Sequence, residues 1–446
     1  MKYGGTRQIV SSFVVGVALS AYCLVSSAGL VWADEPDSAA IKSEMADLKT
    51  RLAKLEGQLG NGQPSLAGGM PMPQLPSELQ GLQMSGFVDT AYTFNFNRPD
   101  TGSSTSSRNV TSNNGRVFDR VANSFAIQAA DLTLEKPLSD QSPIGFRTDL
   151  MFGEDAEQIH SAGLGNVSSV GENPQAFDLE QAYVTFRAPV GAGLDFKVGK
   201  FVTLLGSEVI RSLDNWNYSR SFLFGYAIPF THTGALVSYP VLGEMGSATV
   251  GLVNGWDRAD ENNSFKTMLG SLTLTPMKGV SLISNIISGA ERASDNRNDR
   301  TVLDFVAMWQ PLDKLAFMAN YDIGHESNLL HGTSAGTSGS DGANWNGVAL
   351  YAKYDLTDKW SLAGRWEWFN DADNVRTGFT GLGGNSTLDD LHFTEYTLTS
   401  QWKLYNHMLA RLEYRHDSAN EKVFFSNNKG LTNGQDTLAG ELIYTF

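Results

Sequence analysis

The sequence is poor in cysteine, in long apolar runs and in positive charge. Its one cysteine, Cys23, lies near the N-terminus, so disulfides contribute nothing to the chain beyond it. No stretch after Ala33 has the roughly 18 consecutive apolar residues that a membrane-spanning helix needs. The 33 Lys and Arg against 48 Asp and Glu make nucleic acid an unfavourable partner. If the chain spans a membrane, it must do so as a closed barrel, because strands satisfy their backbone in lipid only when no edge is left.

The N-terminus has the pattern of a secretory signal. Lys2 and Arg7 precede an apolar stretch at roughly residues 13–24, and Ala33 precedes the first acidic residue. A positive start, an apolar middle and a small residue at the cut predict a signal peptide, residues 1–33, that is removed; an uncleaved anchor is the alternative. Cleavage takes away two positive charges and moves the formal net charge from −15 to −17.

Residues 37–59 carry a heptad pattern. Apolar side chains recur there at spacings of four and three, with charged residues between them, at Ile41, Met45, Leu48, Leu52, Leu55 and Leu59. The pattern predicts a short periplasmic helix that joins a coiled coil when a trimeric barrel brings three chains together; a single amphipathic helix packed on the barrel is the alternative. Residues 60–82 are rich in proline and glycine and are expected to form a linker.

From residue 83 onward, apolar and polar residues alternate in runs of roughly 9 to 12 residues, as in strands with two different faces. In one run, Arg411 and Glu413 share the face opposite Leu412. Sixteen such runs lie near residues 84–96, 124–135, 144–153, 178–188, 194–204, 231–239, 246–255, 265–275, 280–289, 300–310, 315–325, 346–356, 360–370, 392–404, 408–417 and 436–446. We therefore predict an all-β fold, an antiparallel transmembrane β-barrel of about 16 strands that occupies residues 83–446.

The connections between the runs alternate in length. Short ones, such as 311–314 and 405–407, alternate with long ones, such as 98–121 and 153–177. Outer-membrane barrels have short periplasmic turns and long outer loops. The last run alone also suits an edge strand of a soluble sheet, but its terminal Phe446 resembles the C-terminal signature of Gram-negative outer-membrane barrels. The expected location is therefore the cell outer membrane, with the N-terminal helix in the periplasm.

Five stretches of the chain also resemble the second beta-barrel porin family of Gram-negative bacteria. The resemblance covers roughly residues 84–446, and it rests on residues 85–97, 132–137, 199–202, 253–257 and most of all 215–234. It implies a sixteen-stranded outer-membrane channel, and it implies no particular substrate.

The connection at residues 206–232 is the candidate for a loop that narrows the pore. It is dense in aromatic rings and carries both signs of charge, at Glu208, Arg211, Asp214 and Arg220. Packed inside the barrel, such a loop would hold these charges across the opening. The alternatives are that it caps the outer rim or contacts a neighbouring subunit.

The alternation also predicts which charged side chains line the lumen. The candidates are Asp89, Lys197, Arg365, Glu367, Arg411, Glu413 and Arg415. Such charges either orient polar solutes or simply support the wall in pairs. Because acidic residues outnumber basic ones in the mature chain, we expect a modest cation preference.

These observations favour a porin, a water-filled channel for passive diffusion of small hydrophilic solutes and ions. The expected partners are outer-membrane lipid, lipopolysaccharide, two further copies in a homotrimer, and the solutes. The alternatives are a structural or adhesive barrel, a sheath for a redox partner, or a barrel enzyme. No catalytic residue, metal or cofactor is expected, because the seven histidines are scattered. The Gly-x-Ser-x-Gly string at residues 332–336 lies in a Gly/Ser-rich loop without the following helix of a nucleophile elbow.

Overall fold

The computed structural model describes residues 81–99, 112–139, 142–165, 176–328, 342–379, 388, 390–427 and 430–446. The predicted signal peptide, the predicted helix at 37–59 and all but the last two residues of the predicted linker lie outside these ranges. Those three segments therefore stay predictions.

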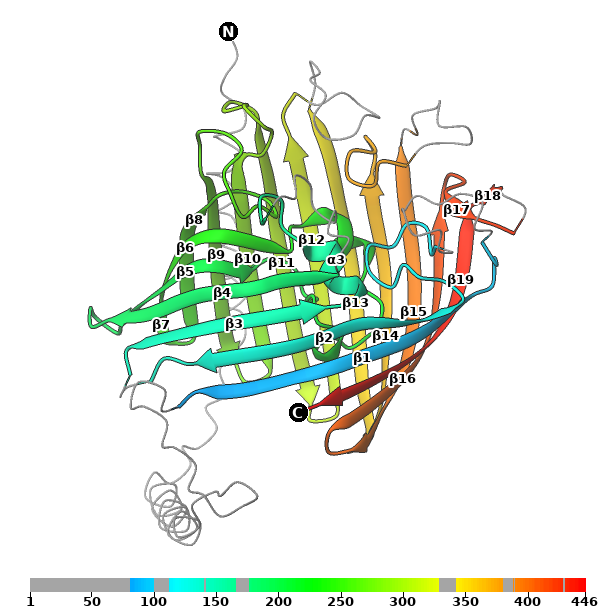
Figure 1. Cartoon of the computed structure of the whole chain (residues 1–446), viewed down its shortest axis with the longest axis horizontal. Helices are drawn as coiled ribbons and strands as arrows, with labels where there is room; N and C mark the ends of the chain where they lie inside the picture. Colours follow the sequence, from blue (N-terminus) through cyan, green and yellow to red (C-terminus); the bar gives the residue numbers. More distant parts are fainter. Residues whose placement is uncertain are drawn as a thin grey trace, which may run out of the picture. The chain divides into compact units, whose positions relative to one another are not determined.

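Within the described residues, sixteen antiparallel strands close into one barrel (Figure 1). They are β1 (Gln83–Asn95), β2 (Ser124–Lys136), β3 (Ile144–Phe152), β4 (Phe177–Ala188), β5 (Leu194–Val202), β6 (Thr231–Tyr239), β8 (Gly246–Val253), β9 (Thr267–Met277), β10 (Val280–Ala290), β11 (Asp299–Leu312), β12 (Leu315–Glu326), β13 (Ala343–Thr357), β14 (Trp360–Asp371), β15 (Leu391–Tyr405), β16 (Met408–Ala419) and β19 (Gly434–Thr445). Each pairs with its neighbour along the chain, and β1 pairs with β19 to close the sheet. The predicted sixteen-stranded barrel is confirmed.

Shorter elements lie in the connections. They are β7 (Val241–Glu244), the helix α3 (Glu154–Ile159), the 3-10 turn η2 (Ser212–Asp214), the π-helical turn η3 (Leu223–Ala227) and the two-stranded sheet of β17 (Phe424–Phe425) and β18 (Leu431–Thr432). Among the described residues, no helix is both long and apolar enough to cross a membrane.

The barrel buries charged side chains and exposes apolar ones, which is the reverse of the pattern in a soluble protein. On β16, Arg411 and Glu413 are 3% and 2% exposed, whereas Leu412 and Tyr414 are 47% and 45% exposed. Soluble proteins bury the apolar set and expose the charged one. Here the charged set faces the enclosed interior, so the apolar outer face belongs in lipid.

Aromatic rings on the outer face gather where the strands meet the short turns. Trp309, Trp360, Tyr405 and Tyr444 are all exposed there. Such rings suit the headgroup level of a bilayer, where an apolar body and a polar edge are both satisfied. The position of these rings therefore places one membrane interface at the short-turn end.

Two glycines permit close contacts at this end of the barrel. The backbone of Phe446 exchanges two hydrogen bonds with Gly86, at 3.0 and 2.9 Å, and a Cβ on Gly86 would come within 2.5 Å of the Phe446 ring. In the β9–β10 turn, Gly279 has a φ of +78°, and a Cβ there would lie 2.6 Å from the carbonyl oxygen of Gln310. Only glycine fits this tight turn without strain.

Candidate functional site

Residues 203–230, the inner segment, connect β5 to β6 and lie inside the barrel. The N–H of Ser207 donates to Asn320 on β12, at 2.9 Å. The N–H of Tyr218 donates to Glu413 on β16, at 2.7 Å. The segment thus contacts the inner faces of strands that are well separated around the sheet, which is possible only from the interior.

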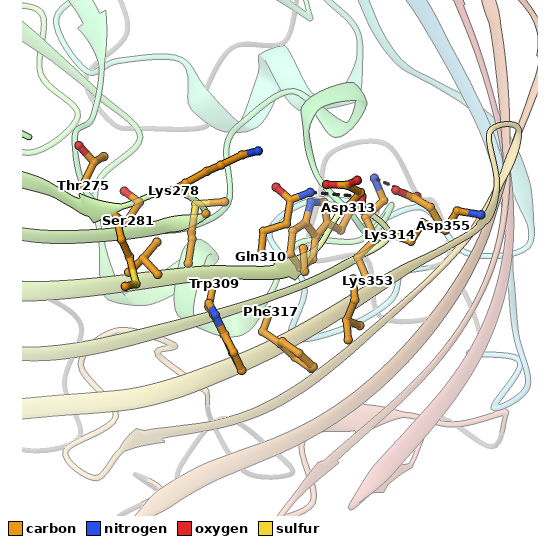
Figure 2. A pocket seen from close by; sticks show the side chains of 17 residues that line it. Thr275, Lys278, Ser281, Trp309, Gln310, Asp313, Lys314, Phe317, Lys353 and Asp355 are labelled. Carbon is orange, nitrogen blue, oxygen red and sulfur yellow. Dashed lines mark hydrogen bonds and ion pairs between the residues drawn. The ribbon is translucent and has the colours of Figure 1, made fainter. Parts of the chain in front are cut away.

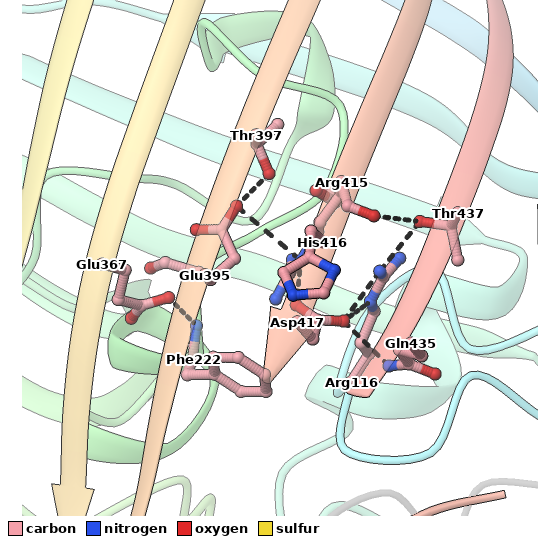
Figure 3. Close-up of polar contacts among 12 residues, drawn as sticks. Arg116, Phe222, Glu367, Glu395, Thr397, Arg415, His416, Asp417, Gln435 and Thr437 are labelled. Carbon is pink, nitrogen blue, oxygen red and sulfur yellow. Dashed lines mark hydrogen bonds and ion pairs between the residues drawn. The ribbon is translucent and has the colours of Figure 1, made fainter. Parts of the chain in front are cut away.

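Two strand carboxylates hold the irregular backbone of the inner segment. Glu413 accepts the successive N–H groups of Tyr218 and Ser219, at 2.7 and 3.0 Å. Glu367 on β14 accepts the N–H of Phe222 at 2.8 Å and that of the next residue at 2.5 Å (Figure 3). Buried N–H groups outside regular structure need such partners, and an ionised acceptor makes the bonds stronger.

Arg365 on β14 joins the barrel wall to the inner segment. It is 3% exposed. One guanidinium nitrogen donates to Glu208 at 2.6 Å and to the carbonyl of Ser219 at 2.5 Å, and another donates to Glu395 on β15 at 2.8 Å. A buried charge is tolerated only when it is paired in this way.

Arg411 on β16 makes a second such junction at η2. Its guanidinium donates to the carbonyls of Ser212 and Asn215, at 2.9 and 2.7 Å, and to Glu441 on β19 at 3.1 Å. The Ser212 hydroxyl also donates to Glu441. The wall therefore holds the turn at η2 through one closed network.

A third junction brings in the loop between β1 and β2. Arg415 on β16 donates to Asp417 at 2.6 Å (Figure 3). It also donates to the carbonyl of Arg220, at 2.6 Å. The other oxygen of Asp417 accepts from Arg116, at 2.8 and 2.9 Å. The Arg415 guanidinium also lies 5.0 Å from the centroid of the Phe222 ring, a cation–π contact.

Arg211 of the inner segment faces three carboxylates from three neighbouring strands. One guanidinium nitrogen lies 3.0 Å from Asp131 on β2, 2.7 Å from Asp149 on β3 and 2.8 Å from Glu180 on β4. In the sheet, β2 to β4 are separated from β16 by β19 and β1, so these contacts and the junctions on β14 to β16 fall within one continuous half of the barrel wall. The inner segment is thus bound at both ends of that half.

Two carboxyl groups in the outer loops are strongly affected by burial. Asp155 in α3 pairs with Arg220 at 2.6 Å. Burial raises the pKa of Asp155 to about 6, against the opposing effect of the Arg220 charge. Asp257, which accepts the N–H groups of Phe230 and Thr231, also has its pKa raised by burial to about 6. These two acids fix neighbouring connections to the inner segment.

Aromatic side chains fill the space between these junctions. Phe118 packs against Phe224 and Phe230, with ring centroids 5.7 and 5.3 Å apart, and Phe222 packs against Phe393 on β15 at 4.8 Å. All five rings are at most 5% exposed. The density of rings in the sequence at 206–232 therefore reflects a packed core within the barrel.

The residues predicted for the site differ in their surroundings. Six charged residues that the sequence singles out in two separate groups meet at the junctions: Glu208, Arg365, Glu367, Arg411, Glu413 and Arg415. Arg220 is buried with Asp155, and Asp89 is fully buried on β1. Asp214 is exposed, and Lys197 lies apart, with its ammonium 4.5 Å from the centroid of the Tyr183 ring. Whether any of them controls solute passage stays a prediction.

Sequence reasoning missed Arg116 and Asp155, which take part in the junctions. Asp417 could have been found, because it lies two residues after Arg415 on the same face of β16. Arg116 and Asp155 lie in loops, where no periodic pattern marks a side chain as inward. Within the described ranges, no group of three or more His, Cys, Asp or Glu could hold a metal ion.

The closed barrel, its apolar outer face and its polar interior define a transmembrane barrel of the porin class. A family model described as "Putative beta-barrel porin-2, OmpL-like" matches residues 81–446, and the chain belongs to this family. It is an outer-membrane porin, and small solutes pass through it passively. Porins are not enzymes.

Solved structures with a similar fold include the outer membrane channel DcaP of Acinetobacter baumannii, with 11% identity and a TM-score of 0.52 over 82% of this chain and 97% of that chain. An anion-selective porin from Comamonas acidovorans has 11% identity and a TM-score of 0.52, over 82% of this chain and 99% of that chain. OmpF of Salmonella typhi, solved with daunomycin, has 11% identity and a TM-score of 0.50 over 82% and 97%. At this identity, the likeness shows the shared fold. No curated protein matches the sequence.

Proposed function

We propose that the inner segment sets the width of a passive pore for small hydrophilic solutes. The observation that carries this proposal is the double attachment of the segment, to β14, β15, β16 and β19 through Arg365 and Arg411 and to β2, β3 and β4 through Arg211. These strands belong to one continuous half of the sheet, from β14 through β19 and β1 to β4, so the segment covers that half of the inner wall and narrows the lumen. Solutes then have to pass beside it.

We expect a modest cation preference from the charged side chains that are not paired inside the barrel. The buried arginines and carboxylates of the junctions largely compensate one another, so they contribute little to the field felt by a passing ion. Asp214 on the inner segment is exposed, and the mature chain is strongly acidic. Reversal potentials in a salt gradient across a planar bilayer test this preference, and a clear anion preference would contradict it.

The same proposal includes a homotrimer in contact with outer-membrane lipid and lipopolysaccharide. The heptad pattern of residues 37–59 supports the trimer. A coiled coil this short is stable only when something else, here the barrel, already holds three chains close together. A sheath for a redox partner is disfavoured, because the inner segment occupies the interior where that partner would lie. A trimer band that resists detergent and dissociates on heating would support the assembly.

The decisive experiment for the constriction replaces residues 207–227 with a short Gly/Ser linker. Single-channel conductance is compared with that of the wild-type protein, and liposome swelling is measured with sugars of increasing size. We expect a larger conductance and entry of larger sugars in the replaced form. Equal conductance in the two proteins would contradict the constriction, and a wild-type protein without channels would contradict the pore itself.

A further inference from the structure

A cavity of about 620 Å³ opens at the short-turn end of the barrel (Figure 2). The ends of five consecutive strands, β9 to β13, form its wall, and Trp216 of the inner segment contributes from the interior. Its volume is in the range of sites that hold small organic molecules. We propose that this cavity binds small organic anions that carry an aromatic ring. The inference rests on the proposed pore function, because such solutes reach the cavity through the lumen.

The charged side chains at the cavity favour an anion. Lys278, Lys314 and Lys353 line it against two acids, Asp313 and Asp355. The Lys353 ammonium lies 3.8 Å from Asp355, whereas Lys278 and Lys314 have no ion-pair partner in the described part of the chain. A lysine on a flexible stem can turn its three donors to an incoming carboxylate. The lining therefore carries one net positive charge in an otherwise acidic protein.

The strands on one side of the cavity are uncharged. β8, β9 and β10 contain no Asp, Glu, Lys or Arg along their whole length. Their inward positions include Thr249, Ser271 and Thr273, which are only partly buried, in contrast to the buried Arg365, Glu395 and Glu413 on β14 to β16. A solute that moves along β8 to β10 toward the short-turn end therefore meets no further charge on these strands before Lys278 in the β9–β10 turn.

The same cavity supplies apolar contacts for a ring. Trp216 is partly buried and packs against the core of the inner segment. Met308, on the inward face of β11, is 39% exposed. Indole rings stack with other aromatic groups, and thioethers make favourable contacts with ring edges. The combination of lysine donors with an indole and a thioether fits an aromatic carboxylate better than a bare inorganic anion.

An anionic lipid headgroup has the same chemistry as such a solute, with a charge attached to an apolar body. Figure 2 shows Lys278, Gln310 and Asp313 on one side of the wall, with Trp309 and Phe317 on the other. Because Trp309 and Phe317 are on the lipid-facing side, Lys278 reaches away from the bilayer and into the interior. This placement favours a solute over a lipid.

The test uses benzoate as the probe on full-length mature protein in planar bilayers of zwitterionic phosphatidylcholine. Benzoate, benzamide and acetate are added in turn to each side, and the concentration that halves the current is measured. We expect block by benzoate at lower concentration than by either control compound, and more readily from the short-turn side. The double variant Lys278→Gln with Lys314→Gln should need about fivefold more benzoate, since two exposed ion pairs are lost.

The matched control is Lys359→Gln, a lysine in the neighbouring β13–β14 turn that does not line the cavity. It should leave the block unchanged. Trp216→Leu should weaken the block by benzoate and leave the block by acetate unaltered. This variant still tests the inference if the double lysine variant fails to fold. Equal block by benzoate and benzamide, or equal block in all variants, would overturn the inference while the pore itself stands.

Loss of the block when phosphatidylglycerol is added to the bilayer would identify a lipid headgroup as the occupant and would overturn the solute assignment. A wild-type protein that forms no channel would instead overturn the proposed pore function. The two failures are therefore distinguishable.

Discussion

Arg365 offers the sharpest test of how the inner segment is held. The substitution Arg365→Met keeps a side chain of similar length and removes the charge, which leaves Glu208 and Glu395 buried next to each other without their common partner. Breaking a buried ion pair from one side costs about 3–5 kcal/mol, because the remaining charge stays desolvated. Glu208 keeps its hydrogen bonds from Ser221. Glu395 keeps Thr397 and the Arg415 guanidinium at 3.8 Å, so we expect a loss within that range and not above it.

The loss is measured as the change in free energy of unfolding, from urea titrations in detergent followed by tryptophan fluorescence and by heat-modifiable gel mobility. A triple variant, Arg365→Met with Glu208→Gln and Glu395→Gln, removes all three charges and should recover most of the stability. Single-channel records of Arg365→Met should show added current noise, since the inner segment has lost one attachment. A change in stability below about 1 kcal/mol would refute this account, because a surface pair costs no more than that.

Three further predictions concern separate parts of the barrel. Gly279→Val should lower stability by more than about 1 kcal/mol and slow assembly on gels, because its Cβ would collide with the Gln310 carbonyl at a positive φ. Leu412→Arg on the outer face should cost about 2–4 kcal/mol in a bilayer if its position is near the midplane, measured by unfolding from vesicles. Asp155 has a folded pKa of about 6, above its ordinary 3.8, so its contribution to stability is present at low pH and is lost as the pH rises through about 6. Asp155→Asn should flatten the pH profile of unfolding in that window, whereas an unchanged profile would contradict the raised pKa.

The sequence was sufficient for the strands, and the physical reason is local. Each strand has one face in lipid and one toward the interior, so the period of two is visible in every run, and all sixteen predicted runs begin and end within three residues of the observed strands. The terminal Phe446 and the alternation of short and long connections then indicated that these strands form a closed barrel. None of these signals depends on contacts between distant residues.

The junctions of the inner segment could be anticipated only in part. The alternation on β14 and β16 correctly separates Arg365 and Glu413 from their lipid-facing neighbours. It does not say that these side chains bind a loop, because the partners of Glu413 lie 195 and 194 residues away. Arg116 illustrates the same limit, since it meets Asp417 across 301 residues from a loop without periodicity.

The account depends most directly on which face of a strand meets water. The mature chain is expected to lack cysteine, so single cysteines can be introduced at neighbouring positions of β9. Ser271 is on the inward face and Leu272, 40% exposed, is on the outward face. A charged, water-soluble methanethiosulfonate reagent should reduce the single-channel current of Ser271→Cys and leave that of Leu272→Cys unchanged. A current that falls only for Leu272→Cys would contradict the assignment of the two faces and with it the pore.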